Sequence, residues 1–268
     1  MKKRVLTLVL AVVLVFSLAA CGSKNETKDD TKKETTDFDY IKGKGKLVVG
    51  ITDFEPMDYK DSDGKWIGFD ADLATAFAKD LGVDVEFMVI EWGNKIFELD
   101  GKTVDCIWNG MTLTDEVTSA MSCSKAYLNN AQVVVMKKSE AGKYPDVQSL
   151  KDLTFAVEEG SSGASAAADN GFKTTNVDSQ AAALMEVAAG TSDAAIIDSL
   201  MAAAMIGEGT SYAELTYTIG LNSEEYGVGF RKGSDMTEKL NAYFDKIKND
   251  GTLAKLAEKY KVQAALIK

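Results

Sequence analysis

The sequence predicts an α/β protein of two lobes, in which each lobe is a mainly parallel sheet flanked by helices. The main observation is that short apolar runs typical of buried strands alternate with helical segments, in two separate series along the chain. Such alternation is typical of parallel sheets with helices on both faces. A late strand and two helices have no series of their own to complete, so we expect them to return to the first lobe.

The chain begins with the features of an export signal. Residues 2–4 are basic, the run from Val5 to Leu18 is almost purely apolar, and the small residues Ala19 and Ala20 follow. The apolar run is shorter than the roughly 20 residues that a membrane span needs. Residues 1–20 are therefore predicted to be a signal peptide.

Cys21 follows the signal directly, and the segment 18–22 resembles the bacterial lipobox. That resemblance implies cleavage before Cys21 and attachment of acyl chains such as palmitate to it. Residues 23–37 contain only polar side chains, too few apolar atoms to offset the entropy of an ordered chain. The sequence thus predicts a lipidated cysteine and flexible tether over 21–39, and an extracytoplasmic protein anchored to the cell membrane.

Composition narrows the class of function. Without the three basic residues of the signal, 27 positive and 41 negative charges remain, a net charge of −14, which disfavours nucleic acid as a partner. Histidine is absent, which removes the usual general base and the commonest metal ligand. We therefore expect no enzyme activity, no cofactor and no metal. For Cys106 and Cys123, a disulfide and two buried thiols both remain open.

The first series contains an amphipathic helix whose apolar residues recur every fourth position until Gly82 ends it. An Asp-Gly turn precedes the last strand of this series. In order, the predicted elements are a strand at 46–51, a helix at 70–81, a strand at 83–89, a short helix at 96–99 and a strand at 104–108.

The second series begins with an apolar strand and contains an alanine-rich helix that ends at Gly190. Its elements are strands at 132–136, 154–157 and 193–197 and helices starting at Ser161 and Ser179; the late strand is 226–230, and the last helices are 235–247 and 253–260. From this order we assign lobe 1 to 40–133, lobe 2 to 134–226 and the return to lobe 1 to 227–268.

Several motifs in this order resemble the family 3 extracellular solute-binding proteins, the amino acid receptors of ABC importers. The motifs lie at 64–74, 101–105, 109–114, 124–127 and 193–198. The resemblance implies the type II periplasmic-binding-protein fold, with two strands crossing between the lobes near 132–137 and 225–230. It also implies a monomer that binds a small ligand in the interlobe cleft and delivers it to permease subunits.

In lobe 1, the resemblance places five residues at the ligand. Phe54 is expected to cover one side of it, and Trp92 takes a second ligand-facing position, although packing in the core is an equal alternative. Asn109 and Gly110 follow a strand, where glycine lets the chain pass close to a ligand, and Thr112 is the expected side-chain contact. The alternative for this segment is an ordinary turn before a capped helix.

In lobe 2, the turn of Gly160, Ser161 and Ser162 connects a strand to a helix start, where free N–H groups favour an anion. A simple serine cap is the alternative. Asp198 ends a strand and matches the acidic residue that holds the ligand's amine in the family, against the alternative of a plain helix cap.

Val117 departs from the resemblance, since family members usually carry there an arginine that grips the ligand carboxylate. The predicted function is capture of an amino acid or related small polar amine for an ABC importer. The alternatives are a dehydratase-like enzyme on the same fold, with Glu55, Glu159 or Asp198 as acid or base, and a ligand-sensing surface lipoprotein.

Overall fold

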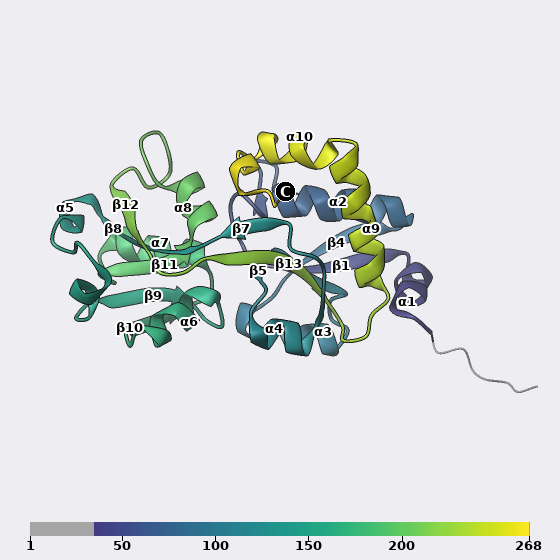
Figure 1. Ribbon diagram of the computed structural model, residues 1–268, viewed down its shortest axis with the longest axis horizontal. Coiled ribbons are helices and arrows are strands. Elements are labelled where there is room, and N and C mark those ends of the chain that lie inside the picture. The colour runs from purple at the N-terminus through teal and green to yellow at the C-terminus, as the bar shows by residue number, and fades with distance from the viewer. Residues whose placement is uncertain (1–34, 268) are drawn as a thin grey trace, which may run out of the picture. The chain divides into compact units, whose positions relative to one another are not determined.

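A computed structural model describes residues 35–267, which belong to one compact unit built on two sheets (Figure 1). The predicted signal peptide, Cys21 and most of the predicted tether lie outside the described residues. The first sheet has the strand order β4-β1-β5-β13-β6, with β7 also paired to β13. The second has the order β10-β9-β11-β8-β12. The predicted two-lobed α/β fold is confirmed.

The first sheet has a parallel core, because β1 lies between β4 and β5 and runs in the same direction as both. β13 joins it antiparallel to β5. Its strands are β1 (Lys46–Ile51), β4 (Asp84–Val89), β5 (Cys106–Thr112), β6 (Ser122–Cys123), β7 (Leu128–Asn130) and β13 (Glu224–Phe230). Its helices are α1 (Asp37–Lys44), α2 (Phe69–Leu81), η1 (Trp92–Asn94), α3 (Lys95–Asp100), α4 (Asp115–Ala120), α9 (Met236–Asn249), α10 (Thr252–Lys259) and η3 (Gln263–Ala265). Figure 1 shows α2 and α10 above this sheet and α3 and α4 below it.

The second sheet is built in the same way, with β9 parallel to both β10 and β11, and β8 antiparallel to β11 and β12. Its strands are β8 (Gln132–Lys137), β9 (Thr154–Glu158), β10 (Lys173–Val177), β11 (Ala194–Asp198) and β12 (Leu215–Gly220). Its helices are α5 (Lys138–Ala141), η2 (Val147–Leu150), α6 (Ser162–Asp169), α7 (Gln180–Ala189) and α8 (Ser199–Met205). A small hairpin of β2 (Tyr59–Lys60) and β3 (Trp66–Ile67) stands apart from both sheets.

The chain crosses between the sheets twice. It leaves the first sheet at the end of β7 and enters the second with β8, and it returns from β12 into β13. The lobe limits expected after 133 and after 226 fall inside β8 and β13, so both crossings occur slightly earlier than expected. After β13 the C-terminal helices pack on the first sheet, where the Phe244 ring meets the Trp108 ring edge to face, with centroids 5.7 Å apart.

Some predicted elements differ from the observed ones for clear physical reasons. The strand expected at 104–108 is β5, which continues to Thr112, so the segment 109–112 is strand and not a turn. Residues 37–39, expected to end the tether, form the first turn of α1, which Thr36 caps by accepting from the Asp39 N–H. β10 and β12 were not predicted, because they are edge strands with mostly exposed, polar sequences.

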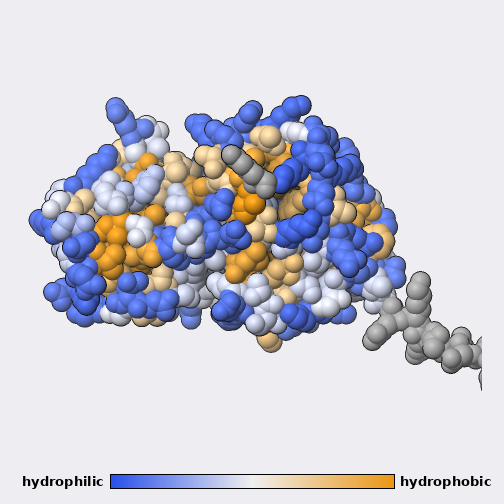
Figure 2. Space-filling model, viewed as in Figure 1, coloured by the Kyte–Doolittle hydropathy of each residue, from blue (hydrophilic) through white to orange (hydrophobic). Residues whose placement is uncertain are grey.

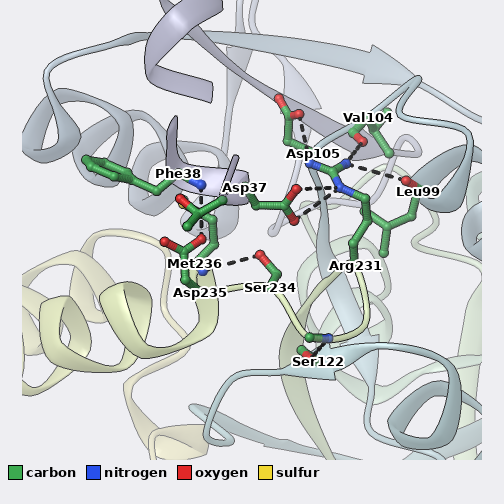
Figure 3. A network of polar contacts seen from close by, with 12 residues as sticks. Asp37, Phe38, Leu99, Val104, Asp105, Ser122, Arg231, Ser234, Asp235 and Met236 are labelled. Atoms are coloured by element: carbon green, nitrogen blue, oxygen red, sulfur yellow. Dashed lines mark hydrogen bonds and ion pairs between the residues drawn. The ribbon is translucent and has the colours of Figure 1, made fainter. Parts of the chain in front are cut away.

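A buried charge network fastens α1 to the first sheet (Figure 3). The Arg231 guanidinium donates to Asp37 at 3.0 Å and to the Val104 carbonyl at 2.8 Å, and lies 3.4 Å from Asp105. Lys44 forms a second ion pair with Asp105 at 2.5 Å. Every charge in this network therefore faces an opposite charge from the same chain. We call these four side chains, Asp37, Lys44, Asp105 and Arg231, the Arg231 network.

Cys106 and Cys123 are free thiols. They lie opposite Phe230 and Gly229, on the two sides of β13. One strand between them separates their Cα atoms by about 10 Å, beyond the roughly 7 Å limit for a disulfide. The alternative of two free thiols is the correct one.

Polar and charged residues cover most of the face in Figure 2, with hydrophobic residues gathered in smaller patches between them. Within residues 35–267 there is no helix long and apolar enough to cross a membrane. The same residues contain no group of three or more acidic or cysteine side chains placed to hold a metal ion.

Candidate ligand-binding site

A cavity of about 630 Å³ lies between the two sheets and is lined by residues from both. All nine residues predicted to contact a ligand line this cleft. They are Phe54, Trp92, Asn109, Gly110, Thr112, Gly160, Ser161, Ser162 and Asp198. The fold thus brings together positions that lie up to 144 residues apart in the sequence.

Phe54 and Gly110 form one wall by direct contact. A Cβ atom on Gly110, which has a φ of 56°, would lie 2.5 Å from the Phe54 ring, so only glycine fits there. The Gly110 N–H donates to the Asp70 carboxylate at 2.7 Å, which holds this part of β5 in place. Phe54 also meets the Tyr226 ring edge to face, at 6.4 Å between centroids. The wall is therefore rigid and aromatic.

Asn109 and Thr112 use their side chains on protein partners. The Asn109 Oδ1 atom accepts from the Thr52 N–H at 2.7 Å, and its Nδ2 atom donates to Asp58 at 2.7 Å. The Thr112 hydroxyl donates to Glu224 at 2.9 Å. Asn109 thus fixes β5 to its own lobe, whereas Thr112 joins a carboxylate that itself lines the cleft.

Trp92 combines both of its expected roles. The side chain is buried in an apolar cluster with Ile90 and Leu99, and it also lines the cleft. The Lys95 ammonium lies 5.2 Å from the centre of the Trp92 ring. Core packing and a position at the cleft therefore hold together for this residue.

The turn before α6 also combines two expectations. Ser161 is the N-cap of α6, since its hydroxyl accepts from the Ala164 N–H at 3.1 Å, so the simple cap is confirmed. The Ser162 hydroxyl donates to Glu224 at 2.5 Å. The first helical N–H groups, on Ser162 and Gly163, have no acceptor within the helix by its geometry and point toward its N-terminal end.

Asp198 is the last residue of β11 and lines the cleft with only 4% of its surface exposed. It makes no side-chain cap for α8, so the plain helix cap is wrong. Its carboxylate accepts from the Tyr226 hydroxyl at 2.6 Å and from three side-chain amides, all of them neutral donors. Burial and the nearby Glu224 charge raise the pKa of Asp198 to about 7. The amides belong to Asn130, Gln132 and Gln180.

Of the cleft carboxyl groups that were not predicted, two lie close enough to Asp198 for their charges to interact with it. Glu158 is buried at the end of β9, its Oε1 atom has no partner within the described residues, and burial followed by the Asp198 charge raises its pKa to about 8. Glu224 accepts from Gln132 at 2.7 Å, beside its contacts with Thr112 and Ser162. Glu158 directly precedes a predicted turn, which was a usable signal. Glu224 accepts from Asn222 two residues before it, but its other partners lie 62 to 112 residues away, and its local sequence gives no signal of the site.

The charges that line the cleft are strongly unbalanced. Lys95 is the one cation among the lining residues, against seven acidic ones. The acidic residues are Asp115, Glu116, Glu158, Asp169, Asp198, Glu224 and Glu225. Like charges repel each other strongly in a space of low dielectric constant. Such a cleft therefore favours a ligand that carries positive charge.

A comparison with known families agrees with this geometry. The family described as bacterial extracellular solute-binding proteins, family 3, matches residues 47–263. The chain belongs to this family. The matched segment includes every residue that lines the cleft described above.

Among relatives of this family 3 protein, the arginine-binding extracellular protein ArtP of Bacillus subtilis (strain 168) is 31% identical, covering 96% of this chain and 98% of ArtP. A crystal structure of a mutant of ArgBP from T. maritima matches with a TM-score of 0.78 and 32% identity, over 84% of this chain and 98% of that one. The ancestral amino acid-binding protein AncCDT-1, a precursor of cyclohexadienyl dehydratase, matches with a TM-score of 0.76 and 34% identity, over 83% and 98% of the chains.

Val117 occupies the position where an arginine is expected in this family 3 protein. It lies in α4, is buried, and lines the cleft through an apolar surface. Thr114 caps α4 by accepting from the Val117 N–H at 3.2 Å, as the alternative of an ordinary capped helix predicts. Among residues 35–267, no arginine side chain lines this cleft.

Proposed function

We propose that this chain is the extracytoplasmic solute receptor of an ABC importer and captures an amino acid with a cationic side chain, or a related amine. The observation that carries the proposal is the buried carboxyl group of Asp198, surrounded by neutral donors and by further carboxyl groups in one cleft. An ammonium at Asp198 would neutralise it and form charge-assisted hydrogen bonds, which are about twice as strong as neutral ones.

A second positive charge on the ligand fits the remaining acidic groups. After burial, the Glu224 charge is the next largest cause that raises the pKa of Asp198, and the Asp198 charge in turn helps to raise the pKa of Glu158. An α-amine alone would neutralise one of these carboxylates, and a cationic side chain would neutralise another. The names of the relatives ArtP and ArgBP point to the same class of ligand.

A thermal-shift screen tests this proposal. The full chain, purified in detergent, is melted with each common amino acid and with small amines. A ligand at about 100 times its dissociation constant adds about 2.7 kcal/mol to the free energy of unfolding. We expect basic amino acids to give the largest shifts and Asp198→Ala to abolish them. Equal shifts with acidic and basic amino acids would contradict the proposal.

The membrane anchor is part of the same proposal. We infer that Cys21 carries the lipid and that the chain delivers its ligand to permease subunits outside the cytoplasm, as its family membership supports. Labelling cells with a palmitate analogue should mark the wild-type chain and not the Cys21→Ser variant. Cell fractionation should find the Cys21→Ser variant outside the membrane fraction. Uptake of the ligand identified above should fall when the gene is deleted.

A dehydratase-like activity is the second candidate, because one cleft carboxyl group is suited to donate a proton. The pKa of about 8 keeps Glu158 protonated at neutral pH, as a general acid requires. Of the acids proposed from the sequence, Asp198 lines the cleft, whereas Glu55 and Glu159 do not. Mass spectrometry of bound ligands after long incubation distinguishes the two functions, because a receptor returns its ligand unchanged. Product that disappears in Glu158→Gln would favour the enzyme.

A further inference from the structure

We infer that Lys95 binds the carboxylate of the amino acid ligand and so replaces the arginine that is missing at Val117. This inference rests on the proposed function, because it assigns one residue to one end of the proposed ligand. Three observations support it: the position of the Lys95 ammonium, the charges near that ammonium, and the other groups that lie beside it in the cleft.

The Lys95 ammonium lies between the two lobes. Lys95 is the first residue of α3 on the first sheet and is 6% exposed. Its Nζ atom donates to the Gly160 carbonyl of the second lobe at 2.9 Å and, more weakly, to the Trp92 carbonyl at 3.4 Å. An ammonium has three N–H donors, so at least one remains for a ligand in the cavity that Lys95 lines.

Among residues 35–267, no carboxylate lies within ion-pair distance of the Lys95 ammonium, although the charges of Glu116 and Glu158 in the same cleft act on it. Of the ion pairs among residues 35–267, none includes Lys95. Both of its acceptors are neutral backbone carbonyls. Burial of an ammonium without a direct counter-charge costs several kcal/mol, which a ligand carboxylate in contact with it would offset.

Other groups at this point of the cleft also favour an anion. The contact with Gly160 places the ammonium at the turn before α6, where the N–H groups of Ser162 and Gly163 have no acceptor within the helix. The carboxyl groups of Asp198 and Glu224 meet the amide and hydroxyl cluster described above. Lys95 and the α6 turn thus form a subsite for the carboxylate, and Asp198 forms one for the amine.

Lys95 also bridges the lobes, so a change in overall affinity alone would not show contact with a carboxylate. The experiment therefore compares each amino acid with the amine that lacks only its carboxylate: arginine with agmatine, and lysine with cadaverine. Loss of the lobe bridge weakens both members of a pair equally, whereas loss of a carboxylate contact weakens the amino acid alone.

Calorimetric dissociation constants are measured for the full chain in detergent, as wild type and as Lys95→Met, Lys95→Gln and Lys95→Arg. Lys248→Met, an exposed lysine on α9, controls for the change in net charge. We expect Lys95→Met and Lys95→Gln to lower the preference for the amino acid over its amine by about tenfold to 100-fold, the range for one charge-assisted hydrogen bond. Lys95→Arg should keep most of the preference, and Lys248→Met all of it.

A rescue variant sharpens the test. Adding Val117→Arg to Lys95→Met restores a cation to the cleft wall, and the preference for the amino acid should return in part. If Lys95→Met and Lys95→Gln weaken both members of each pair equally, Lys95 acts on lobe closure alone and the inference is wrong. If the wild-type chain melts cooperatively but binds no amino acid, the proposed function is wrong, and the inference on Lys95, which rests on it, is wrong as well.

Discussion

Two buried aspartates in this protein have opposite surroundings. Asp105, directly before β5 of the first sheet, is fully buried and faces two cations, Lys44 and Arg231, of which Figure 3 shows Arg231. Asp198, in the cleft, is 4% exposed and accepts from neutral groups only, with other carboxyl groups nearby. The chain neutralises the first by its own folding. Under the proposed function a cationic ligand would neutralise the second, so the comparison sets a structural charge against a proposed binding charge.

The largest expected effect tests the structural side of this comparison. Asp105→Asn leaves Arg231 and Lys44 without their buried counter-charge, so the free energy of unfolding should fall by about 3–5 kcal/mol. Denaturant titration measures it. The control is Asp245→Asn, which breaks the exposed pair with Lys125 and should cost less than about 1 kcal/mol. Equal losses in the two variants would contradict a structural role for the Arg231 network.

The matching change in the cleft should act on binding instead. Asp198→Asn removes a charge that has no ion pair within residues 35–267, so the unfolding free energy without ligand should change by less than about 1 kcal/mol. Affinity for the cationic ligand should fall about 30-fold or more, as for loss of one partner of a buried charge pair. A loss of stability as large as that of Asp105→Asn would remove the distinction.

The pH dependence sharpens the same contrast. The pKa values of Asp198 (about 7) and Glu158 (about 8) exceed the ordinary values of 3.8 and 4.5, so the unliganded folded state binds more protons than the unfolded state between these limits. Their contribution to stability is complete below pH 4 and is lost as the pH rises through 7 and 8. A cationic ligand that requires both ionised forms should lose affinity by about tenfold per pH unit between pH 8 and 7, and by up to about 100-fold per unit below pH 7.

Calorimetry from pH 5.5 to 8.5 measures this dependence, and comparison of buffers with different ionisation enthalpies counts the protons released on binding. Glu158→Gln should remove the part of the dependence near pH 8 and leave the part near pH 7. Affinity that does not change over this range would mean that neither carboxyl group meets the cationic end of the ligand.

The smallest expected effect concerns the contact between the lobes. A Cβ atom on Gly160, at a φ of 70°, would lie 2.6 Å from the Gly93 Cα atom of the other lobe. Gly160→Ala should therefore lower the affinity for every ligand, by about 1–3 kcal/mol, because the lobes cannot approach as closely. Gly171→Ala has a similar φ of 68° with nothing within 4 Å, and it should leave binding unchanged.

The local sequence and the family resemblance were sufficient to predict much of the fold and nine of the residues that line the cleft. Strands such as Lys46–Ile51 and helices such as 70–81 follow from runs of apolar residues and their spacing, which report burial directly. Phe54, Gly160 and Asp198 were proposed from the family resemblance together with their positions at the ends of predicted strands, which meet at one edge of a parallel sheet. Val117 could likewise be recognised, as a residue type that departs from a known pattern.

The tertiary structure alone decided which charges are paired and which are free. Glu224 accepts from Thr112 and Asn130, which lie 112 and 94 residues away, and Lys95 meets Gly160 across 65 residues. The periodicity of apolar residues in a sequence reports only whether a residue is buried, because burial is set by its position within the local helix or strand. Whether a buried charge meets its opposite depends on how two separate lobes face each other, and no local pattern encodes that distance.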